Sequence, residues 1–328
     1  MLKQIASWLS EGHQCWLATV VATYGSSPRP EGSVMTCNPD GRVVGSLSGG
    51  CVEDDLLDKL TQGSLAKSNP QFFRYGETAE EAEKLGLPCG GHLDIVVEPL
   101  EPSESNTQAF STIASHLKAR QCITRRADFS TNTVNIETTT SYLPFSFDKE
   151  RNLLCQTFGP RYQLFIVGTG MVSNYVAELA QVLDYQVTLI DPRQDRLNDV
   201  EIDGITKVCE MPDDVIRARA NDSQSAVVAL SHDPRIDDMG LMGAFDTVAF
   251  YIGAMGSSRT TAKRRARLLE LDISLDQLER LHAPIGIPIG SKTPPEIAIS
   301  ILAEITAIRN ELSIPELLVD ASESVSSI

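Results

Sequence analysis

The segment that most restricts the fold of this chain lies just past its midpoint. An apolar stretch at residues 163–167 runs directly into Gly168-Thr169-Gly170, and apolar residues then recur at helical spacing up to Leu183. A second apolar stretch, residues 186–190, ends at Asp191. Strand, glycine turn, helix and strand in this order predict a βαβ unit. We therefore expect an α/β protein in which a smaller N-terminal α/β module precedes a Rossmann-like, doubly wound parallel sheet.

The same unit predicts a nucleotide site. Gly168 and Gly170 let a phosphate approach the main chain, and Asp191 follows 23 residues after Gly168, where a carboxylate grips a ribose hydroxyl. Ser173 occupies the third glycine position of this fingerprint. The third glycine normally lets the helix pack closely on the strand, and this packing tolerates Ser. The replacement therefore weakens the prediction of tight dinucleotide binding more than the prediction of the fold. His232 follows another predicted strand, and we interpret it as a structural residue.

Strands and helices continue to alternate towards the C-terminus. The strand expected at residues 247–252 leads into a loop that contains Ser257 and Arg259 and opens a helix. Its main-chain N–H groups, hydroxyls and guanidinium are suited to binding a phosphate. A dense basic cluster follows, which we interpret as a solvated helix face. Its members are Lys263, Arg264, Arg265 and Arg267.

A second glycine-rich turn lies nearer the N-terminus. A strand expected at residues 42–47 runs into Gly49-Gly50-Cys51, and an amphipathic helix is expected from about residue 52. The free N–H groups and the dipole of a helix N-terminus favour a thiolate. Cys51 is therefore a candidate nucleophile, sulfur carrier or soft-metal ligand. The alternative is a buried structural thiol that follows a tight turn.

A similar turn, Cys89-Gly90-Gly91-His92, precedes a short strand expected at residues 93–97. Cys51 and Cys89 are each flanked by glycine and lie next to a strand. This arrangement is suited to placing them on opposite sides of the entrance to one pocket. Cys89 and His92 also have the spacing of zinc ligands, but a closed zinc site needs four ligands and no second pair of that kind is present. We expect no zinc here, and the alternative for Cys89 is a core residue in a tight turn.

Composition excludes several classes of function. The 328 residues carry a formal net charge of −16, which argues against nucleic acid or anionic lipid as partners of the whole surface. No apolar run approaches the ~20 residues of a membrane span. The seven scattered cysteines are typical of a reducing cytoplasm.

We expect four regions along the chain. They are an N-terminal module at residues 1–100, a β-rich linker region at 101–160, the Rossmann-like domain at 161–312 and a frayed tail at 313–328. The last helix of the third region is well specified, because Thr293 is placed as its N-cap, Pro294 as its first residue and Glu296 as the capping-box partner.

Several spaced motifs together resemble the XdhC/CoxI family of accessory proteins. They are Gly25-Ser-Ser-Pro-Arg-Pro30, Ser48-Gly-Gly-Cys-Val-Glu53, Leu87-Pro-Cys-Gly-Gly91, Ile190-Asp-Pro-Arg193, Tyr251-Ile-Gly253, Gly256-Ser-Ser-Arg259, Pro284-Ile-Gly286 and Thr293-Pro-Pro-Glu-Ile-Ala298. The resemblance covers most of the chain and weakens in its middle and its tail. Met171 departs from the family, which usually has His after the second Rossmann glycine.

The resemblance implies a maturation factor rather than an enzyme. Such proteins bind the molybdenum cofactor in its molybdopterin form, protect it while a cysteine desulfurase sulfurates it, and deliver it to the apoenzyme of a molybdenum hydroxylase such as xanthine dehydrogenase. We expect this chain to act in that way in the cytoplasm and to form a homodimer. We also expect NAD or another nucleotide in the C-terminal domain.

Fourteen residues are expected to contact the molybdenum cofactor or a nucleotide. They are Ser48, Gly49, Gly50, Cys51, Glu53, Cys89, Gly90, Gly91, Gly168, Gly170, Asp191, Arg193, Ser257 and Arg259, with Cys51 as the molybdenum ligand. One alternative function is an NAD(P)-dependent oxidoreductase, which is disfavoured because no residue set outside the glycine loop supports hydride transfer. The other is a scaffold that docks the desulfurase and the target enzyme without holding cofactor.

Overall fold

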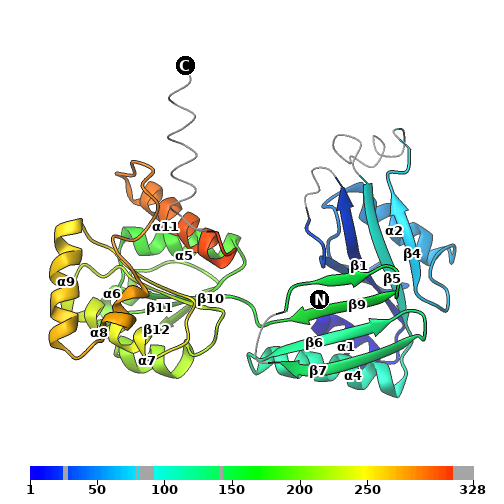
Figure 1. Ribbon diagram of the computed structural model, residues 1–328, viewed down its shortest axis with the longest axis horizontal. Helices are drawn as coiled ribbons and strands as arrows, with labels where there is room; N and C mark the ends of the chain where they lie inside the picture. The colour runs from blue at the N-terminus through cyan, green and yellow to red at the C-terminus, as the bar shows by residue number, and fades with distance from the viewer. Residues whose placement is uncertain (25–28, 79, 81–91, 140–142, 313–328) are drawn as a thin grey trace. The chain divides into compact units, whose positions relative to one another are not determined.

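The computed structural model describes residues 1–24, 29–78, 80, 92–139 and 143–312 (Figure 1). The chain divides into two compact units, Met1–Pro160 and Arg161–Ile328. The expected frayed tail and the turn at Cys89, Gly90 and Gly91 lie outside the described residues. None of the helices in the described ranges is long and apolar enough to cross a membrane.

The first unit is built on an antiparallel five-stranded sheet. Its strand order is β3-β2-β1-β5-β4. The strands are β1 (Cys15–Tyr24), β2 (Val34–Cys37), β3 (Val43–Gly45), β4 (Gln71–Tyr75) and β5 (His92–Leu100). The strand expected at residues 42–47 corresponds to β3, which forms an antiparallel hairpin with β2. However, its second strand ends at Gly45 instead of residue 47, because the N–H of Leu47 donates to the side chain of Glu53.

Successive side chains of β1 point to opposite faces of the sheet, so the core of this unit has two parts. Trp16, Ala18 and Val20 face helix α2 (Cys51–Thr61), which packs through Leu56 and its apolar neighbours. The opposite side of the sheet is covered by helices α1 (Leu2–Ser10) and α4 (Glu104–Lys118) and by a second sheet. Helix α4 begins after the N-cap Ser103, whose side chain accepts a hydrogen bond from the N–H of Asn106.

The second sheet of this unit is antiparallel, with the order β7-β6-β9-β8. Its strands are β6 (Cys122–Asp128), β7 (Thr133–Thr139), β8 (Ser146–Asp148) and β9 (Leu153–Phe158). Arg125 of β6 is fully buried and pairs with the buried Glu98 of β5, so a charged contact links the two sheets. The region expected as a β-rich linker thus packs within the first compact unit.

The second unit contains a six-stranded parallel sheet with the order β12-β11-β10-β13-β14-β15. Its strands are β10 (Gln163–Val167), β11 (Gln186–Ile190), β12 (Thr206–Val208), β13 (Ser225–Ala229), β14 (Tyr251–Ala254) and β15 (Leu281–His282). This order, in which the chain winds out from β10 in both directions, is that of a Rossmann fold. The predicted fold class is confirmed.

Helices cover both faces of the parallel sheet (Figure 1). They are α5 (Met171–Val182), α6 (Gln194–Asn198), α7 (Pro212–Arg219), α8 (Pro234–Phe245), α9 (Ser258–Glu270), α10 (Leu275–Glu279) and α11 (Pro294–Arg309). Leu164 and Ile166 of β10 point to the core beneath α5 and α11, and Phe165 points to the core beneath α7 and α8. The predicted cap of α11 at Thr293 and Glu296 is confirmed.

In the second unit, β14 differs from its prediction. β14 begins at Tyr251 rather than at residue 247, because Thr247 completes the end of α8 and its hydroxyl donates to the carbonyl of Ala244. Apolar composition alone extends the strand too far back, since Val248 and its neighbours follow the helix C-cap at Asp246. The displacement does not alter the loop that follows the strand.

Candidate functional site

Four strands of the first unit have an end on the same side of its five-stranded sheet. β1, β3 and β4 end on this side and β5 begins there, as the antiparallel pairings require. Tyr24 at the end of β1 pairs with His92 at the start of β5, and their rings stack with centroids 3.8 Å apart. The turn that carries Cys51 leaves the end of β3 in the same direction.

The turn before Cys51 is organised by the carboxylate of Glu53. Six groups of residues 46–50 donate hydrogen bonds to this carboxylate. They are the Ser46 hydroxyl (2.7 Å), the N–H groups of Leu47 (2.7 Å), Ser48 (2.8 Å), Gly49 (2.9 Å) and Gly50 (3.0 Å), and the Ser48 hydroxyl (2.9 Å). Burial opposes ionisation of Glu53, but these hydrogen bonds outweigh it and hold its pKa well below the ordinary value.

This arrangement corrects one expectation. The free N–H groups at this helix N-terminus were expected to favour the thiolate of Cys51, yet the four N–H groups of residues 47–50 donate to Glu53. The anion at this helix N-terminus is therefore the protein's own carboxylate. Through these hydrogen bonds Glu53 holds the turn in place.

Cys51 itself is the first residue of α2, and its side chain is exposed. The alternative of a buried structural thiol is therefore wrong. A Cβ built on Gly49 or on Gly50 would have no described atom within 4 Å, so the surface beside the thiol is open. Gly49 has φ +86° and needs glycine for its conformation, whereas Gly50 has an extended φ of −166° that any residue adopts.

The other described cysteines have different environments. Cys15 and Cys37 are buried in the first sheet, and burial raises the pKa of each thiol to about 12. Cys122 and Cys155 are buried in the second sheet, and Cys209 is exposed in the second unit. Across the described ranges, no three His, Cys, Asp or Glu side chains gather in a way that would hold a metal ion. Cys51 is therefore available as a single soft ligand.

In the second unit, the two glycines of the Rossmann turn have separate roles. A side chain at Gly168, which has φ +90°, would overlap the Cα and Cβ of Ser231, so the fold itself requires glycine there. Gly170 has an extended φ of 169°, and no described atom lies within 4 Å of a Cβ built on it. Gly170 is thus the position where a ligand finds the main chain uncovered.

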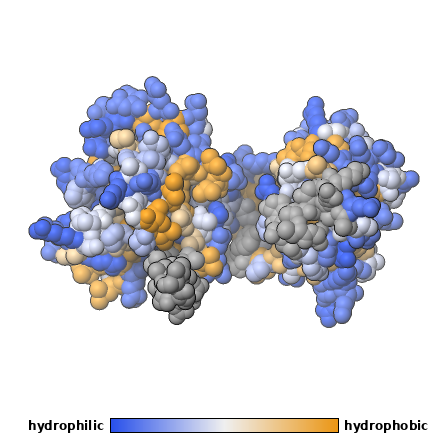
Figure 2. Space-filling model, turned by 90° about the horizontal axis from the view of Figure 1, so that it is seen from above, coloured by the Kyte–Doolittle hydropathy of each residue, from blue (hydrophilic) through white to orange (hydrophobic). Residues whose placement is uncertain are grey.

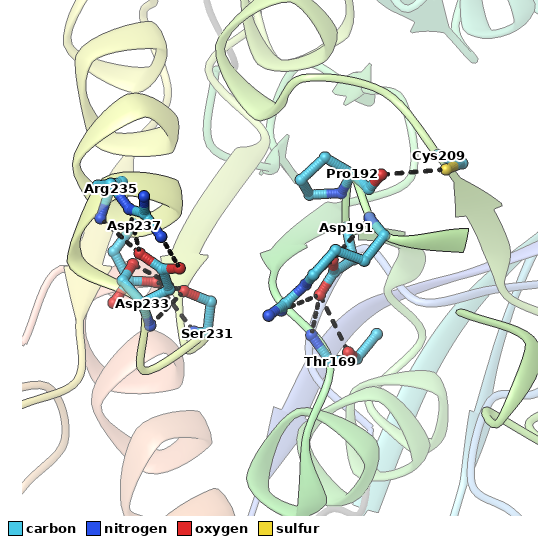
Figure 3. A network of polar contacts seen from close by, with 9 residues as sticks. Thr169, Asp191, Pro192, Cys209, Ser231, Asp233, Arg235 and Asp237 are labelled. Carbon is cyan, nitrogen blue, oxygen red and sulfur yellow. Dashed lines mark hydrogen bonds and ion pairs between the residues drawn. The ribbon is translucent and has the colours of Figure 1, made fainter. Parts of the chain in front are cut away.

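Asp191 is hydrogen-bonded to Thr169, the middle residue of the Rossmann turn (Figure 3). Its buried carboxylate accepts hydrogen bonds from the N–H and hydroxyl of Thr169, both at 3.0 Å, and from the guanidinium of Arg193 at 2.8 Å. Burial opposes its ionisation, but the hydrogen bonds from Arg193 and Thr169 lower its pKa below the ordinary value. In this arrangement a ribose hydroxyl reaches Asp191 only if the Arg193 side chain moves.

A cleft of about 600 Å³ lies at the carboxyl ends of β13 and β14. Ser257, Gly256 and Thr260 line it from the start of α9. Arg259 is exposed and does not belong to the lining residues. Parallel sheets bind ligands at this edge.

The basic residue at this cleft is Arg264, and its assignment to a solvated helix face is wrong. Arg264 is 2% exposed and lines the cleft. Its guanidinium contacts Asp237 at 2.9 Å, Asp238 at 3.2 Å and the carbonyl of Met255 at 2.9 Å. Asp237 also accepts from the Ser231 hydroxyl at 2.6 Å (Figure 3). The ion pair fixes the wall of the cleft.

Sequence reasoning also missed His232. This residue is exposed, lines the cleft and has φ +61°, a left-handed conformation that is uncommon outside glycine but that asparagine, aspartate and histidine adopt more often than other residues. It is therefore not a core histidine. The only sequence signal for its place at the cleft was its position directly after a buried strand.

Apolar residues gather on a third surface of the second unit, between α5 and α11 (Figure 2). A groove of about 490 Å³ is lined there by Leu183, Leu302 and Ala307. Val182 is 82% exposed beside it, and Ile299 is 53% exposed.

Comparison with known proteins shows the same two-part organisation. Residues 8–76 match the family model described as "XdhC and CoxI family", and residues 164–305 match the one described as "XdhC Rossmann domain". The first match contains Cys51 and Glu53, and the second contains Gly168, Gly170 and the cleft at α9.

Two curated relatives are similar along most of their length. The molybdenum cofactor insertion chaperone PaoD of Escherichia coli is 26% identical over 307 residues, which are 92% of this chain and 85% of the relative. A Bacillus subtilis protein named as a probable xanthine dehydrogenase subunit is 24% identical, and the match covers 93% of this chain and 96% of the relative.

A solved structure shares the fold. A protein of Bacillus halodurans, described as a xanthine dehydrogenase, superposes with a TM-score of 0.73 over 95% of this chain and 96% of its own. The two sequences are 22% identical, so this likeness concerns the fold alone.

Proposed function

Because the chain belongs to the XdhC and CoxI family, we propose that it is an accessory chaperone that carries the molybdenum cofactor as cargo. It holds the cofactor while a cysteine desulfurase sulfurates it and then delivers it to a molybdenum hydroxylase of the xanthine dehydrogenase kind. The printed names of the Escherichia coli and Bacillus subtilis relatives support this role.

The observation that carries the proposal is the setting of Cys51. Its exposed thiol stands at a helix N-terminus, after a turn that Glu53 holds rigid and beside main chain that carries no side chain at Gly49 and Gly50. A thiolate is a soft ligand suited to molybdenum and is also the form that accepts persulfide sulfur. An open, preorganised thiol lets a bulky cargo approach and leave again.

We further propose that residues 1–100 form the cargo-binding module and that the Rossmann unit, residues 161–312, receives a phosphate or nucleotide. Gly170 and the cleft at Ser257 support this second site, since both lie at the carboxyl edge of a parallel sheet. NAD is one nucleotide that this edge would accept. Calorimetry with NAD and with cytidine nucleotides tests the site, and no heat at millimolar ligand would contradict it.

Self-association in the cytoplasm is part of the same proposal. The exposed apolar groove between α5 and α11 supports it, because a second copy would remove Val182 and Ile299 from water. Light scattering at micromolar concentration tests it: the mass of a dimer is expected, and a monomer mass would contradict it.

Delivery is the direct test of the proposed function. Cofactor-free xanthine dehydrogenase is mixed with the purified chain from a molybdate-replete host, and the recovered dehydrogenase activity is measured. Wild type and Cys209→Ala, which removes an exposed thiol of the second unit, are expected to activate the apoenzyme. Cys51→Ala is expected to fail. Activation by Cys51→Ala at the wild-type level would contradict the role of Cys51.

A further inference from the structure

The Rossmann turn and the cleft at α9 adjoin each other in the second unit. A Cβ built on Gly168 would lie 2.1 Å from the Cβ of Ser231, and the next residue, His232, lines the cleft. The strands that precede Gly168 and Ser231, β10 and β13, are direct neighbours, and the helices α5 and α8 that follow them cover opposite faces of the sheet. Parallel sheets bind dinucleotides across such a crevice. One ligand can therefore occupy both the turn and the cleft.

The positive charge of the cleft is already balanced within the protein. Among the described residues that line the cleft, Arg264 is the only lysine or arginine. Each of its nitrogen atoms donates to a protein group: Nε to Asp238, Nη1 to the carbonyl of Met255 and Nη2 to Asp237. Both carboxylates are buried beside it. A phosphate or carboxylate of a ligand would lose water here without gaining a free cation, so the cleft disfavours an anionic group.

The rest of the lining is suited to a flat ring with an amide substituent. Three apolar side chains contribute to it, those of Met255, Ile285 and Ile297. At the start of α9 the hydroxyls of Ser257 and Thr260 lie 3.0 Å apart, and the Ser257 hydroxyl also accepts from the N–H of Thr260. One of these hydroxyls donates to the other, so the second O–H hydrogen remains for the carbonyl oxygen of an amide.

Two side chains of α11 fix the wall that carries Ile285. The carboxylate of Glu304 accepts from the N–H of Gly286 at 2.6 Å, and the hydroxyl of Ser300 donates to the carbonyl of Ile287 at 2.6 Å. The loop that lines the cleft is thus held to a buried helix face on both sides of Gly286. A preformed wall of this kind reduces the conformational entropy that a ligand must remove on binding.

We propose that the second unit binds a nicotinamide dinucleotide, with the pyrophosphate at Gly170 and the carboxamide ring in the cleft at α9. This inference rests on the proposed nucleotide site and assigns the part of the ligand that fills the cleft. Thr260 and His232 are then residues that determine specificity. The hydroxyl pair of Thr260 and Ser257 donates to the carboxamide oxygen, and the imidazole of His232 offers a further hydrogen bond at the exposed side of the cleft.

Calorimetry with three ligands that differ at one end tests the assignment. NAD is compared with ADP-ribose, which lacks the ring, and with nicotinic acid adenine dinucleotide, which carries a carboxylate in place of the carboxamide. Each is titrated against the full chain. NAD is expected to bind about tenfold more tightly than either of the others, because only NAD brings an amide without a negative charge into the cleft.

Two substitutions in the cleft locate the effect. Thr260→Val removes the hydroxyl and keeps the shape of the side chain, and His232→Gly removes the imidazole at a residue with φ +61°. Each is expected to weaken NAD binding about threefold and to leave ADP-ribose binding unchanged. Thr133→Val is the matched control, because this exposed threonine of β7 also shares a hydroxyl contact, with Thr131 at 2.9 Å, and lies outside the cleft. It is expected to bind all three ligands as wild type does.

The outcomes separate this inference from the proposed nucleotide site. If NAD and ADP-ribose bind equally well, or if Thr260→Val and His232→Gly bind NAD as tightly as Thr133→Val does, the cleft assignment is overturned and the nucleotide site stands. Tightest binding of the carboxylate analogue would also overturn the assignment, since the cleft would then accept an anion. If wild type binds none of the three ligands, the nucleotide site and this inference fall together, whereas the cargo role of Cys51 is decided by the delivery experiment.

Discussion

The carboxylate of Glu53 accepts hydrogen bonds from both the N–H and the hydroxyl of Ser48, and through such contacts it fixes the main chain that leads to Cys51. A side chain two residues beyond the thiol thus shapes the turn in front of it. The negative charge of Glu53 occupies the helix N-terminus that was expected to favour the thiolate. In the proposed function, the thiol therefore meets its cargo on the open side of the turn.

Replacing this carboxylate is expected to loosen the turn. Glu53→Gln keeps the size of the side chain but turns an N–H₂ group towards N–H donors, so we expect a loss of about 1–3 kcal/mol in the free energy of unfolding. Urea denaturation at pH 7 measures it. An unchanged midpoint would show that the six hydrogen bonds contribute nothing net.

The same change has a pH signature. The pKa of Glu53 is depressed in the folded state, so its stabilising contribution is complete above the ordinary glutamate pKa of about 4.3 and is lost as the pH falls from there towards the native pKa. The stability difference between wild type and Glu53→Gln is expected to shrink on acidification below about pH 4.3. A difference that is constant or grows in acid would contradict this assignment.

Two adjacent glycines are expected to respond differently to alanine. Gly49→Ala forces a side chain into φ +86° and is expected to cost about 1 kcal/mol of stability. Gly50 has extended backbone and open space, so Gly50→Ala is expected to leave the thermal midpoint unchanged and to reduce cofactor retention. Thermal unfolding and molybdenum analysis of both variants test this. Full retention by Gly50→Ala would show that the cargo does not approach the main chain there.

The Rossmann glycines offer a parallel comparison. Gly168→Ala would place its side chain in Ser231 and is expected to destabilise the second unit severely, whereas Gly170→Ala is expected to fold normally and to lose nucleotide binding. Calorimetry with NAD measures the second effect. We expect NADP to bind more weakly than NAD, because the Asp191 carboxylate disfavours a 2′-phosphate. Tighter binding of NADP would contradict the predicted ribose position.

Arg264 is expected to act as a structural anchor of the cleft at α9. Arg264→Met leaves the buried carboxylates of Asp237 and Asp238 without their partner, and a loss of about 3–5 kcal/mol is expected. Arg259→Met, on the exposed side of the same helix, is expected to change stability by less than about 0.5 kcal/mol. Chemical denaturation of the two variants compares them directly. Equal effects would show that the buried ion pairs are not needed.

The fold was predictable from sequence where local pattern and tertiary packing agree. The βαβ unit around Gly168 was predicted correctly because apolar strands, the glycine turn and a periodic helix all indicate the same structure. The strand β14 was predicted to begin too early, at residue 247, because Thr247 belongs to the end of α8 and Val248 is 61% exposed after it. Periodicity cannot distinguish those two positions.

The site was harder to predict because its polar groups find partners within the protein. Glu53 was recognised as part of a motif, but only the structure shows that its carboxylate occupies the helix N-terminus. Arg264 has the sequence context of an exposed helix face, and its burial depends on Asp237 and Asp238 of α8. Pairing between elements distant in sequence decided the case of Arg264, whereas the contacts of Glu53 lie within seven residues of it.

The central claim is that Cys51 holds a molybdenum cargo at the open turn. The most direct measurement is the molar ratio of molybdenum and pterin to protein in samples purified from a molybdate-replete host, for wild type, Cys51→Ala and Cys209→Ala. We predict that wild type and Cys209→Ala retain both components in similar amounts, while Cys51→Ala folds normally and loses the molybdenum. Equal molybdenum and pterin contents in wild type and Cys51→Ala would contradict the claim.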